Sequence, residues 1–93
     1  MNIEFDAEKD RRNIAKHGIS LAMAALIDWS KAVTFPDDRR FYGEERFTGY
    51  GRIHERLHCV IYTYRGSAVR IISLRKANQR EVLRYGQAGQ TYH

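Results

Sequence analysis

Three consecutive segments rich in β-branched and aromatic residues constrain the fold of this 93-residue chain more than any other feature. They cover residues 45–53, 57–64 and 68–74, and their composition favours extended strands. Arg65-Gly66-Ser67 separates the last two segments and supplies a short glycine-containing turn of the kind that joins the strands of a β-hairpin. We therefore expect an antiparallel meander of three strands in the second half of the chain.

The first half of the chain predicts two helices. Asp6 is a suitable N-cap for a helix over Ala7–His17, and Gly18 suits the position after its last turn, where a left-handed conformation is needed. Ser20 has the character of a second N-cap. The helix that it would begin, Leu21–Trp29, is apolar on nearly every side, and we therefore expect it to be buried.

Two short strands and a last helix complete the expected elements. Residues 2–5 and 32–35 resemble strands, and Pro36 ends the second of them before a polar loop over residues 37–40. Asn78 and Glu81 have the spacing of a capping box and predict a helix that ends near Gly86.

Together these elements predict an α+β fold. Two N-terminal helices would pack on a mainly antiparallel sheet of about four strands, followed by a C-terminal helix. We expect one domain over residues 1–93, with residues 87–93 as a flexible tail.

The charge of the chain is unevenly distributed. Residues 1–38 contain five cations and seven acids, whereas residues 39–93 contain eleven cations and four acids, and ten of those eleven cations are arginine. Arginine presents a planar fork that matches phosphate. Tyrosines are interleaved with these arginines, and this pattern favours a nucleic-acid partner, although a charged surface also serves solubility.

The remaining composition predicts a cytoplasmic protein. The single cysteine, Cys59, excludes a disulfide within the chain, which suits a reducing compartment. The first ten residues lack the basic and apolar stretches of a signal peptide, and no apolar run approaches the roughly 20 residues that span a bilayer. We expect no contact with a membrane.

Residues 54–58, His-Glu-Arg-Leu-His, match the H-E-x-x-H pattern of zinc metalloproteases, which requires a helix. Two glycines precede this segment, and a β-branched and aromatic run follows it, so an extended conformation is favoured. In a strand, His54 and His58 would stand about 13 Å apart at ~3.3 Å per residue, too far to share one zinc ion. We interpret His54–Arg56 as a hairpin tip and His58 as a half-exposed strand residue, and we expect no metal site.

Three groups of residues occur in order along the chain. They are Phe5-Asp6-Ala7-Glu8-Lys9, Asn13 and Lys16-His17-Gly18-Ile19-Ser20; then Gly43-Glu44-Glu45-Arg46-Phe47 with Gly51-Arg52; then Arg65-Gly66, Arg70–Ala77, Glu81 and Tyr85. Together they resemble the BrnT-type toxins, the ribonuclease component of bacterial type II toxin–antitoxin systems. The departures, such as Phe5 in place of the common Trp and Leu21 in place of the common Phe, affect packing and capping.

The resemblance implies a RelE-like α+β fold that cleaves RNA without a metal or another cofactor. It also implies a cognate ribbon-helix-helix antitoxin that neutralises the toxin. Operator DNA would be bound only through the complex of the two proteins. The alternative function is a non-catalytic nucleic-acid or protein-binding module that uses the same basic sheet.

Cleavage of this kind needs a base for the 2′-hydroxyl, cations for the charge that develops on phosphorus, and an acid for the 5′-oxygen. Arg75 is the first candidate for phosphate binding, because the resemblance implies an arginine near the end of the last strand; otherwise it covers apolar surface. Arg46 and Arg70 either bind the scissile phosphate or pair with Glu44 or Glu45.

Two further candidates suit proton transfer. His17 lies within the resembling motif and has an ordinary pKa near 6.5, but it could instead interact with the C-terminal dipole of its helix. Tyr85 either stacks on a base, donates a proton, or packs on the sheet. The candidates for contact with the RNA backbone are Lys76, Arg80, Arg84 and Arg52.

Overall fold

The computed structural model describes residues 1–38 and 43–87 and contains a five-stranded mixed sheet with helices at its sides. The strand order is β1-β5-β4-β3-β2, in which β1 pairs parallel to β5 and all other neighbours are antiparallel. The elements are β1 (Asn2–Glu4), α1 (Ala7–His17), η1 (Leu21–Leu26), η2 (Trp29–Lys31), β2 (Val33–Pro36), β3 (Phe47–Ile53), β4 (Arg56–Arg65), β5 (Ala68–Lys76) and α2 (Gln79–Tyr85).

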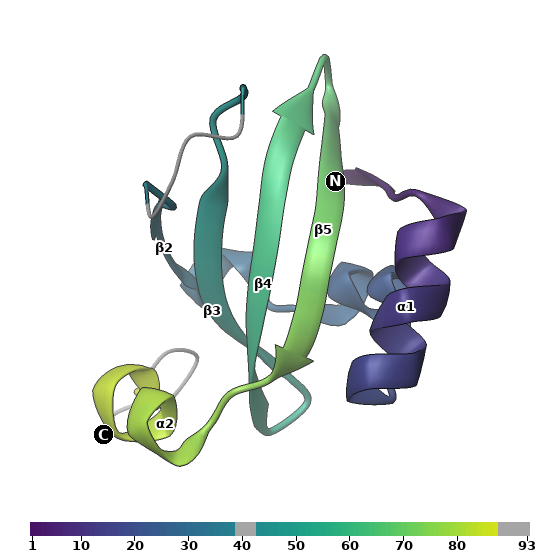
Figure 1. Ribbon diagram of the computed structural model, residues 1–93. Coiled ribbons are helices and arrows are strands. Elements are labelled where there is room, and N and C mark those ends of the chain that lie inside the picture. The colour runs from purple at the N-terminus through teal and green to yellow at the C-terminus, as the bar shows by residue number, and fades with distance from the viewer. Residues whose placement is uncertain (39–42, 88–93) are drawn as a thin grey trace.

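The predicted α+β class and the three-stranded meander are confirmed, but the sheet has five strands rather than about four. Figure 1 shows α1 beside β5, α2 near the C-terminus on the side of β2 and β3, and the blue η1–η2 segment crossing behind the sheet. Of the predicted tail, Gln87 lies in a turn, whereas residues 88–93 lie outside the part that the structure describes. Residues 39–40 of the predicted loop also lie outside it.

Local sequence signals fix the ends of both α-helices as predicted. The Asp6 carboxylate accepts a hydrogen bond from the Lys9 amide at 2.9 Å, and Gly18 adopts a left-handed conformation with φ of 73°. At α2, the Asn78 side chain accepts from the Glu81 amide at 2.8 Å while the Glu81 carboxylate accepts from the Asn78 amide at 2.9 Å. This is the reciprocal capping box that the spacing predicted.

The prediction of one helix over Leu21–Trp29 is wrong. The chain forms two short 3₁₀ helices instead, and it is not buried on every side, since the side chain of Leu26 is half exposed. A 3₁₀ helix repeats every three residues, so Leu21, Ala24 and Ile27 align on the face that packs on the sheet. The segment is held in this form by hydrogen bonds from the Trp29 indole to the Ala24 carbonyl and from the Asp28 amide to the Arg52 carbonyl.

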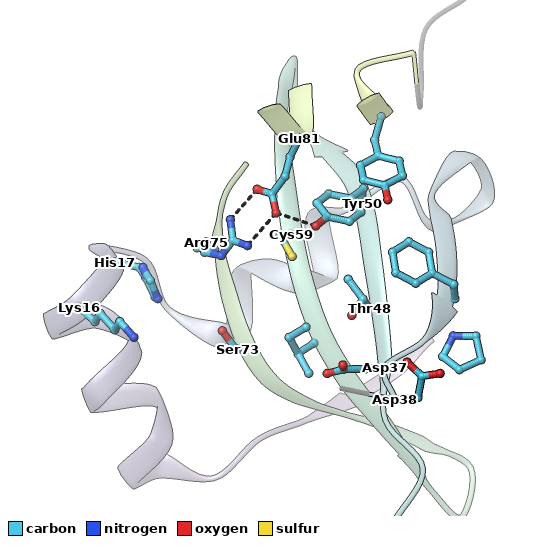
Figure 2. Close-up of a pocket in the computed structure, with 14 residues that line it drawn as sticks. Lys16, His17, Asp37, Asp38, Thr48, Tyr50, Cys59, Ser73, Arg75 and Glu81 are labelled. Atoms are coloured by element: carbon cyan, nitrogen blue, oxygen red, sulfur yellow. Dashed lines mark hydrogen bonds and ion pairs between the residues drawn. The ribbon is translucent and has the colours of Figure 1, made fainter. Parts of the chain in front are cut away.

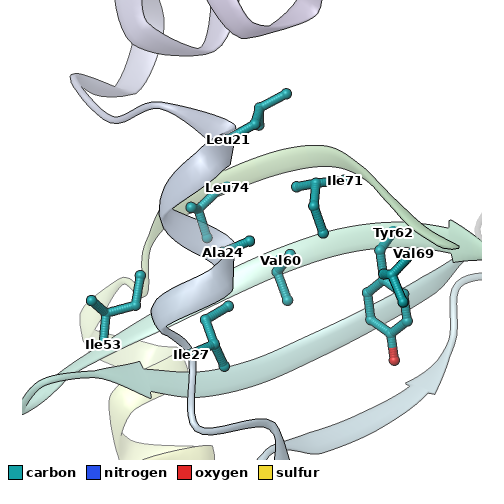
Figure 3. Packing of buried hydrophobic residues seen from close by; sticks show 9 residues of the cluster. All are labelled: Leu21, Ala24, Ile27, Ile53, Val60, Tyr62, Val69, Ile71 and Leu74. Atoms are coloured by element: carbon teal, nitrogen blue, oxygen red, sulfur yellow. The ribbon is translucent and has the colours of Figure 1, made fainter. Parts of the chain in front are cut away.

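The main core lies between this 3₁₀ segment and one face of the sheet (Figure 3). Gly51 allows the close approach, because a Cβ there would lie 2.6 Å from Cγ2 of Ile27. Burial of each large aliphatic side chain stabilises the fold by about 1.5–3 kcal/mol. The buried residues of this core are Leu21, Ala24, Ile27, Ile53, Val60, Tyr62, Val69, Ile71 and Leu74.

The zinc-like segment is a β-hairpin rather than a helix. His54 and Glu55 form the turn between β3 and β4, with a positive φ of 55° at His54, and Arg56 begins β4. His58 is buried rather than half exposed, and its Nδ1 lies 2.8 Å from the Arg56 carbonyl. The two histidines therefore do not share the helix face that the metalloprotease pattern requires.

Asn13 attaches α1 to the sheet by imitating a neighbouring strand. Its side-chain amide donates to the Leu74 carbonyl at 2.8 Å, and its carbonyl accepts from the Leu74 amide at 3.2 Å. The same amide group donates to the Ile19 carbonyl at 2.8 Å. Because β1 pairs with β5 only at residues 68–70, these bonds satisfy backbone groups of β5 beyond the end of β1.

Replacing Asn13 by Leu tests this attachment. The change should lower the free energy of unfolding by about 2–5 kcal/mol, because buried backbone groups lose their partners at about 1–3 kcal/mol each. Urea denaturation measures the loss. An exposed change on the same helix, Ala15→Gln, should alter stability by less than about 0.5 kcal/mol. Equal stability of Asn13→Leu and the wild type would show that the attachment contributes nothing.

Candidate active site

A cleft of about 480 Å³ opens on the sheet face opposite the main core (Figure 2). Its floor consists of two rows of residues that the strand register aligns across β3, β4 and β5. Tyr50 pairs with Cys59, which pairs with Arg75; in the next row Thr48 pairs with Ile61, which pairs with Ser73. The residues that line the cleft are Lys16, His17, Phe35, Pro36, Asp37, Asp38, Thr48, Tyr50, Cys59, Ile61, Ser73, Arg75, Glu81 and Tyr85.

An irregularity in β5 sets which side chains reach this face. Ile61 of β4 pairs with Ser73, but the next residue, Tyr62, pairs with Ile71, so Ile72 is an extra residue in β5. In a regular strand, side chains alternate between the two faces, so Ile71 and Leu74 would point to opposite faces. The extra residue lets both point to the same face, and both are fully buried in the main core. It therefore places Arg75 on the cleft face, the same face as Arg70, although five positions separate them.

The carboxylate of Glu81 holds Arg75 in a defined orientation. Nη1 of Arg75 donates to Oε1 of Glu81 at 2.7 Å, and Nη2 donates to Oε2 at 2.9 Å. The Tyr50 hydroxyl donates to the same Oε2 at 2.6 Å, as the dashed lines in Figure 2 mark. Two-point pairing fixes the guanidinium plane, which a single contact would not do.

These contacts shift the titration of all three groups. The hydrogen bonds from Arg75 lower the pKa of Glu81 from 4.5 to about 2, against the opposing effect of burial. Pairing with Glu81 raises the pKa of Arg75 above its ordinary value. Burial, followed by the hydrogen bond to Glu81, raises the pKa of Tyr50. At neutral pH, the cleft thus holds a charged arginine, a charged carboxylate and a neutral phenol.

Aromatic rings form one end of the cleft. The rings of Tyr50 and Tyr85 stack with centroids 4.2 Å apart and an interplanar angle of 15°. Phe35 of β2 lies 6.1 Å from the Tyr50 ring and 6.0 Å from the Tyr85 ring. The Tyr85 ring thus packs on Tyr50 of the sheet, which was one of the interpretations open for it, and the same stack leaves an aromatic wall beside the arginine.

His17 reaches the cleft from the end of α1, and Figure 2 shows it with Lys16 pointing towards Ser73 and Arg75. Burial lowers the pKa of His17 below 6.5, and the positive charges of Lys16 and Arg75 lower it further. The imidazole is therefore mainly neutral at pH 7. A neutral imidazole can accept a proton.

The structure brings together three of the predicted catalytic candidates, Arg75, His17 and Tyr85. Arg70 and Arg46 do not line the cleft. Arg70 pairs with Glu4 of the neighbouring strand at 3.4 Å, and Arg46 lies 3.8 Å from Glu44. The alternative of pairing with Glu44 or Glu45 therefore fits Arg46, whereas Arg70 pairs with Glu4, which the sequence did not indicate.

The four residues predicted to contact the RNA backbone lie outside the cleft lining as well. Lys76, Arg80 and Arg84 have exposed side chains. Arg52 instead has a structural contact, since its guanidinium donates to the carbonyl oxygens of Glu55 and Gly86. It therefore connects the β3–β4 turn to the end of α2.

Sequence reasoning did not select Glu81 or Tyr50 as site residues, although both are central to the cleft. Glu81 was recognised as a capping residue and as part of the family resemblance, and Tyr50 only as one of the tyrosines interleaved with the arginines. The signal that could have found them is the register of the meander, which aligns Tyr50 with Cys59 and Arg75. That register depends on the hairpin turns and on the bulge.

Within residues 1–38 and 43–87, no group of three or more His, Cys, Asp or Glu side chains is placed to hold a metal ion. The helices in this part of the chain are too short or too polar to cross a membrane.

The fold and the site define a small α+β protein with a tyrosine-lined cleft on one face of a mixed sheet, in which a carboxylate holds an arginine in place. Residues 5–81 match the profile of a family described as the ribonuclease toxin, BrnT, of type II toxin–antitoxin systems. The match covers more than three quarters of the chain, and the chain therefore belongs to this family of ribonuclease toxins. Membership implies RNA as the substrate and an antitoxin as the partner. No individually curated protein matched the chain.

The Glu81–Arg75 pair should make stability dependent on pH. The pKa of Glu81 falls on folding, so its stabilisation is complete above about pH 4.5 and disappears as the pH falls towards 2. The loss should be roughly 2–3 kcal/mol. Urea unfolding at pH 5 and pH 2 measures it, and Glu81→Gln should lose correspondingly less between these values. Equal losses in the variant and the wild type would contradict the assignment.

Proposed function

We propose that this chain is an endoribonuclease that cleaves RNA in the Arg75 cleft without a metal, using the 2′-hydroxyl of the RNA as the nucleophile. The observation that carries the proposal is the fixed guanidinium of Arg75 on the cleft floor, with a neutral histidine across from it. Such a pair supplies the two functions that the reaction needs most: a positive charge beside the phosphate and a proton acceptor.

In the proposed reaction, His17 removes the proton from the 2′-hydroxyl while its oxygen attacks the adjacent phosphorus. The bond from phosphorus to the 5′-oxygen breaks, which leaves a 2′,3′-cyclic phosphate. The departing 5′-oxygen takes a proton from Tyr85 and becomes a hydroxyl. The proton held by His17 then restores Tyr85 through solvent, so no oxidant or additional reactant is consumed.

Arg75 can bind the phosphate while it remains paired with Glu81. A guanidinium has five N–H donors. Two donate to Glu81 and one to the Lys76 carbonyl at 3.3 Å, so two have no protein partner within residues 1–38 and 43–87. These two donors are available for the equatorial oxygens, where charge increases in the transition state.

The finer features of the family resemblance belong to the same proposal. We assign the fold to the RelE-like group, because an N-terminal helical segment packs on an antiparallel meander that carries an arginine at its end. We also propose a ribbon-helix-helix protein as the antitoxin, with operator DNA bound only by the complex. The three resembling segments in the sequence support both assignments.

Replacement of Arg75 tests the proposal. Arg75→Ala should lower the cleavage rate about 10²–10³-fold, the usual effect of removing one donor from a developing charge. The cleavage rate of Arg75→Lys should lie between those of the wild type and Arg75→Ala, because lysine keeps the positive charge but lacks the planar fork of donors. Cleavage of a labelled RNA by purified protein and growth after induced expression are the measurements.

Arg56→Ala is the matched control, since Arg56 is an exposed arginine at the start of β4 outside the cleft. It should cleave and arrest growth like the wild type, and circular dichroism should show that all variants are folded. Full cleavage by Arg75→Ala would exclude the proposed role of Arg75. A wild-type protein that binds RNA but neither cleaves it nor arrests growth would leave the non-catalytic binding module as the function.

A further inference from the structure

A second groove continues from the cleft along α1. Lys16, His17 and Ser73 line both the cleft and this groove, so the two hollows share a boundary. The groove lies between α1 and the bulge of β5 and has a volume of about 190 Å³. Its lining residues are Lys9, Arg12, Asn13, Lys16, His17, Ile72 and Ser73.

Three cations of α1 form a stripe along this groove. Lys9, Arg12 and Lys16 are spaced by three and four residues and therefore share one face of the helix. Lys16 follows Lys9 by seven positions, so the stripe spans about 10 Å along the helix axis. Because Lys16 also lines the cleft, the stripe leads outward from the site of the proposed chemistry.

The stripe is not neutralised by nearby acids. No ion pair involves Lys9, Arg12 or Lys16 in the described parts of the chain, residues 1–38 and 43–87. The acidic side chains of α1 make their contacts elsewhere. Glu8 pairs with Arg11, and Asp10 accepts hydrogen bonds from the Ser20 hydroxyl and the Leu21 amide.

This contrasts with the two arginines of β5, which have acidic partners. Arg70 pairs with Glu4 and Arg75 with Glu81. The groove thus offers exposed positive charge next to a single apolar side chain, Ile72, and the Ser73 hydroxyl. This lining suits a chain of phosphates better than a protein segment, which would need apolar pockets for its anchoring side chains.

We propose that the RNA strand next to the scissile phosphate lies in the α1 groove, where Lys9 and Arg12 bind its phosphates. This inference rests on the proposed function, because it places the scissile phosphate at Arg75. It moves the contact surface for the substrate backbone to α1, whereas the sequence predicted it at Lys76, Arg80, Arg84 and Arg52. The bulge at Ile72 and the attachment of Asn13 to Leu74 fix the position of the stripe relative to the cleft.

Arg12 and Arg11 form a matched pair for the test. They are adjacent, both are exposed, and substitution of either removes one positive charge, but only Arg12 lines the groove. The probe is a fluorescently labelled 12-nucleotide RNA with 2′-O-methyl riboses, which cannot be cleaved. Fluorescence anisotropy at several salt concentrations gives the affinity and its salt dependence for the wild type and for Arg11→Gln, Arg12→Gln and Lys9→Gln/Arg12→Gln.

Each phosphate contact on a single strand contributes about 0.7 to the slope of log affinity against log salt. Arg12→Gln should therefore lower the slope by about 0.7 and the double variant by about 1.4, whereas Arg11→Gln should keep the wild-type slope. The weakening by the double variant should be greater for the 12-nucleotide RNA than for a trinucleotide that fills only the cleft. Unchanged melting temperatures would confirm that the exposed substitutions leave the fold intact.

Equal slopes for Arg11→Gln and Arg12→Gln would overturn the inference, since only the net charge would then matter. In that case a wild-type protein that still cleaves unmodified RNA would leave the proposed function standing. If the wild type neither binds nor cleaves RNA, the proposed function fails and the inference fails with it. The two failures are thus distinguishable in one set of measurements.

Discussion

One carboxylate, that of Glu81, joins three of the elements that form the cleft, β3, β5 and α2. It accepts hydrogen bonds from Arg75 of β5, from the Tyr50 hydroxyl of β3 and from the Asn78 amide at the start of α2. The favourable interaction with Arg75 more than compensates for the burial of the carboxylate, so the pKa of Glu81 is lowered rather than raised. The same ion pair therefore anchors a short helix and keeps a guanidinium fixed on the cleft floor.

The sheet determines what surrounds this ion pair. The extra residue Ile72 lets Ile71 and Leu74 both enter the main core while Arg75 turns towards the cleft. Asn13 bonds to the backbone of Leu74, one residue before Arg75, and so positions the end of α1 with His17 at the cleft edge. Packing on one face of the sheet and chemistry on the other are thus set by neighbouring residues of one strand.

The sequence predicted the features that depend on local interactions. The hairpin turn at Gly66 and the caps at Asp6 and Asn78 could be inferred from residues close together in the chain, and the family membership from three short motifs in order. The prediction of a single helix after Ser20 was wrong, because α and 3₁₀ helices share the same cap signals. Contacts with distant residues decide between the two forms, here the hydrogen bond between Asp28 and Arg52. The roles of Glu81 and Tyr50 were missed because they follow from cross-strand register, which a bulge changes without a clear trace in composition.

The central claim is that a fixed arginine and a neutral histidine promote attack by the RNA's own 2′-hydroxyl. The most direct test is the chemical structure of the ends produced when the purified protein cleaves a defined RNA in the presence of EDTA. We expect a 2′,3′-cyclic phosphate on one fragment and a 5′-hydroxyl on the other, at a rate that EDTA does not change. A 5′-phosphate with a 3′-hydroxyl, or cleavage abolished by EDTA and restored by a divalent cation, would contradict it.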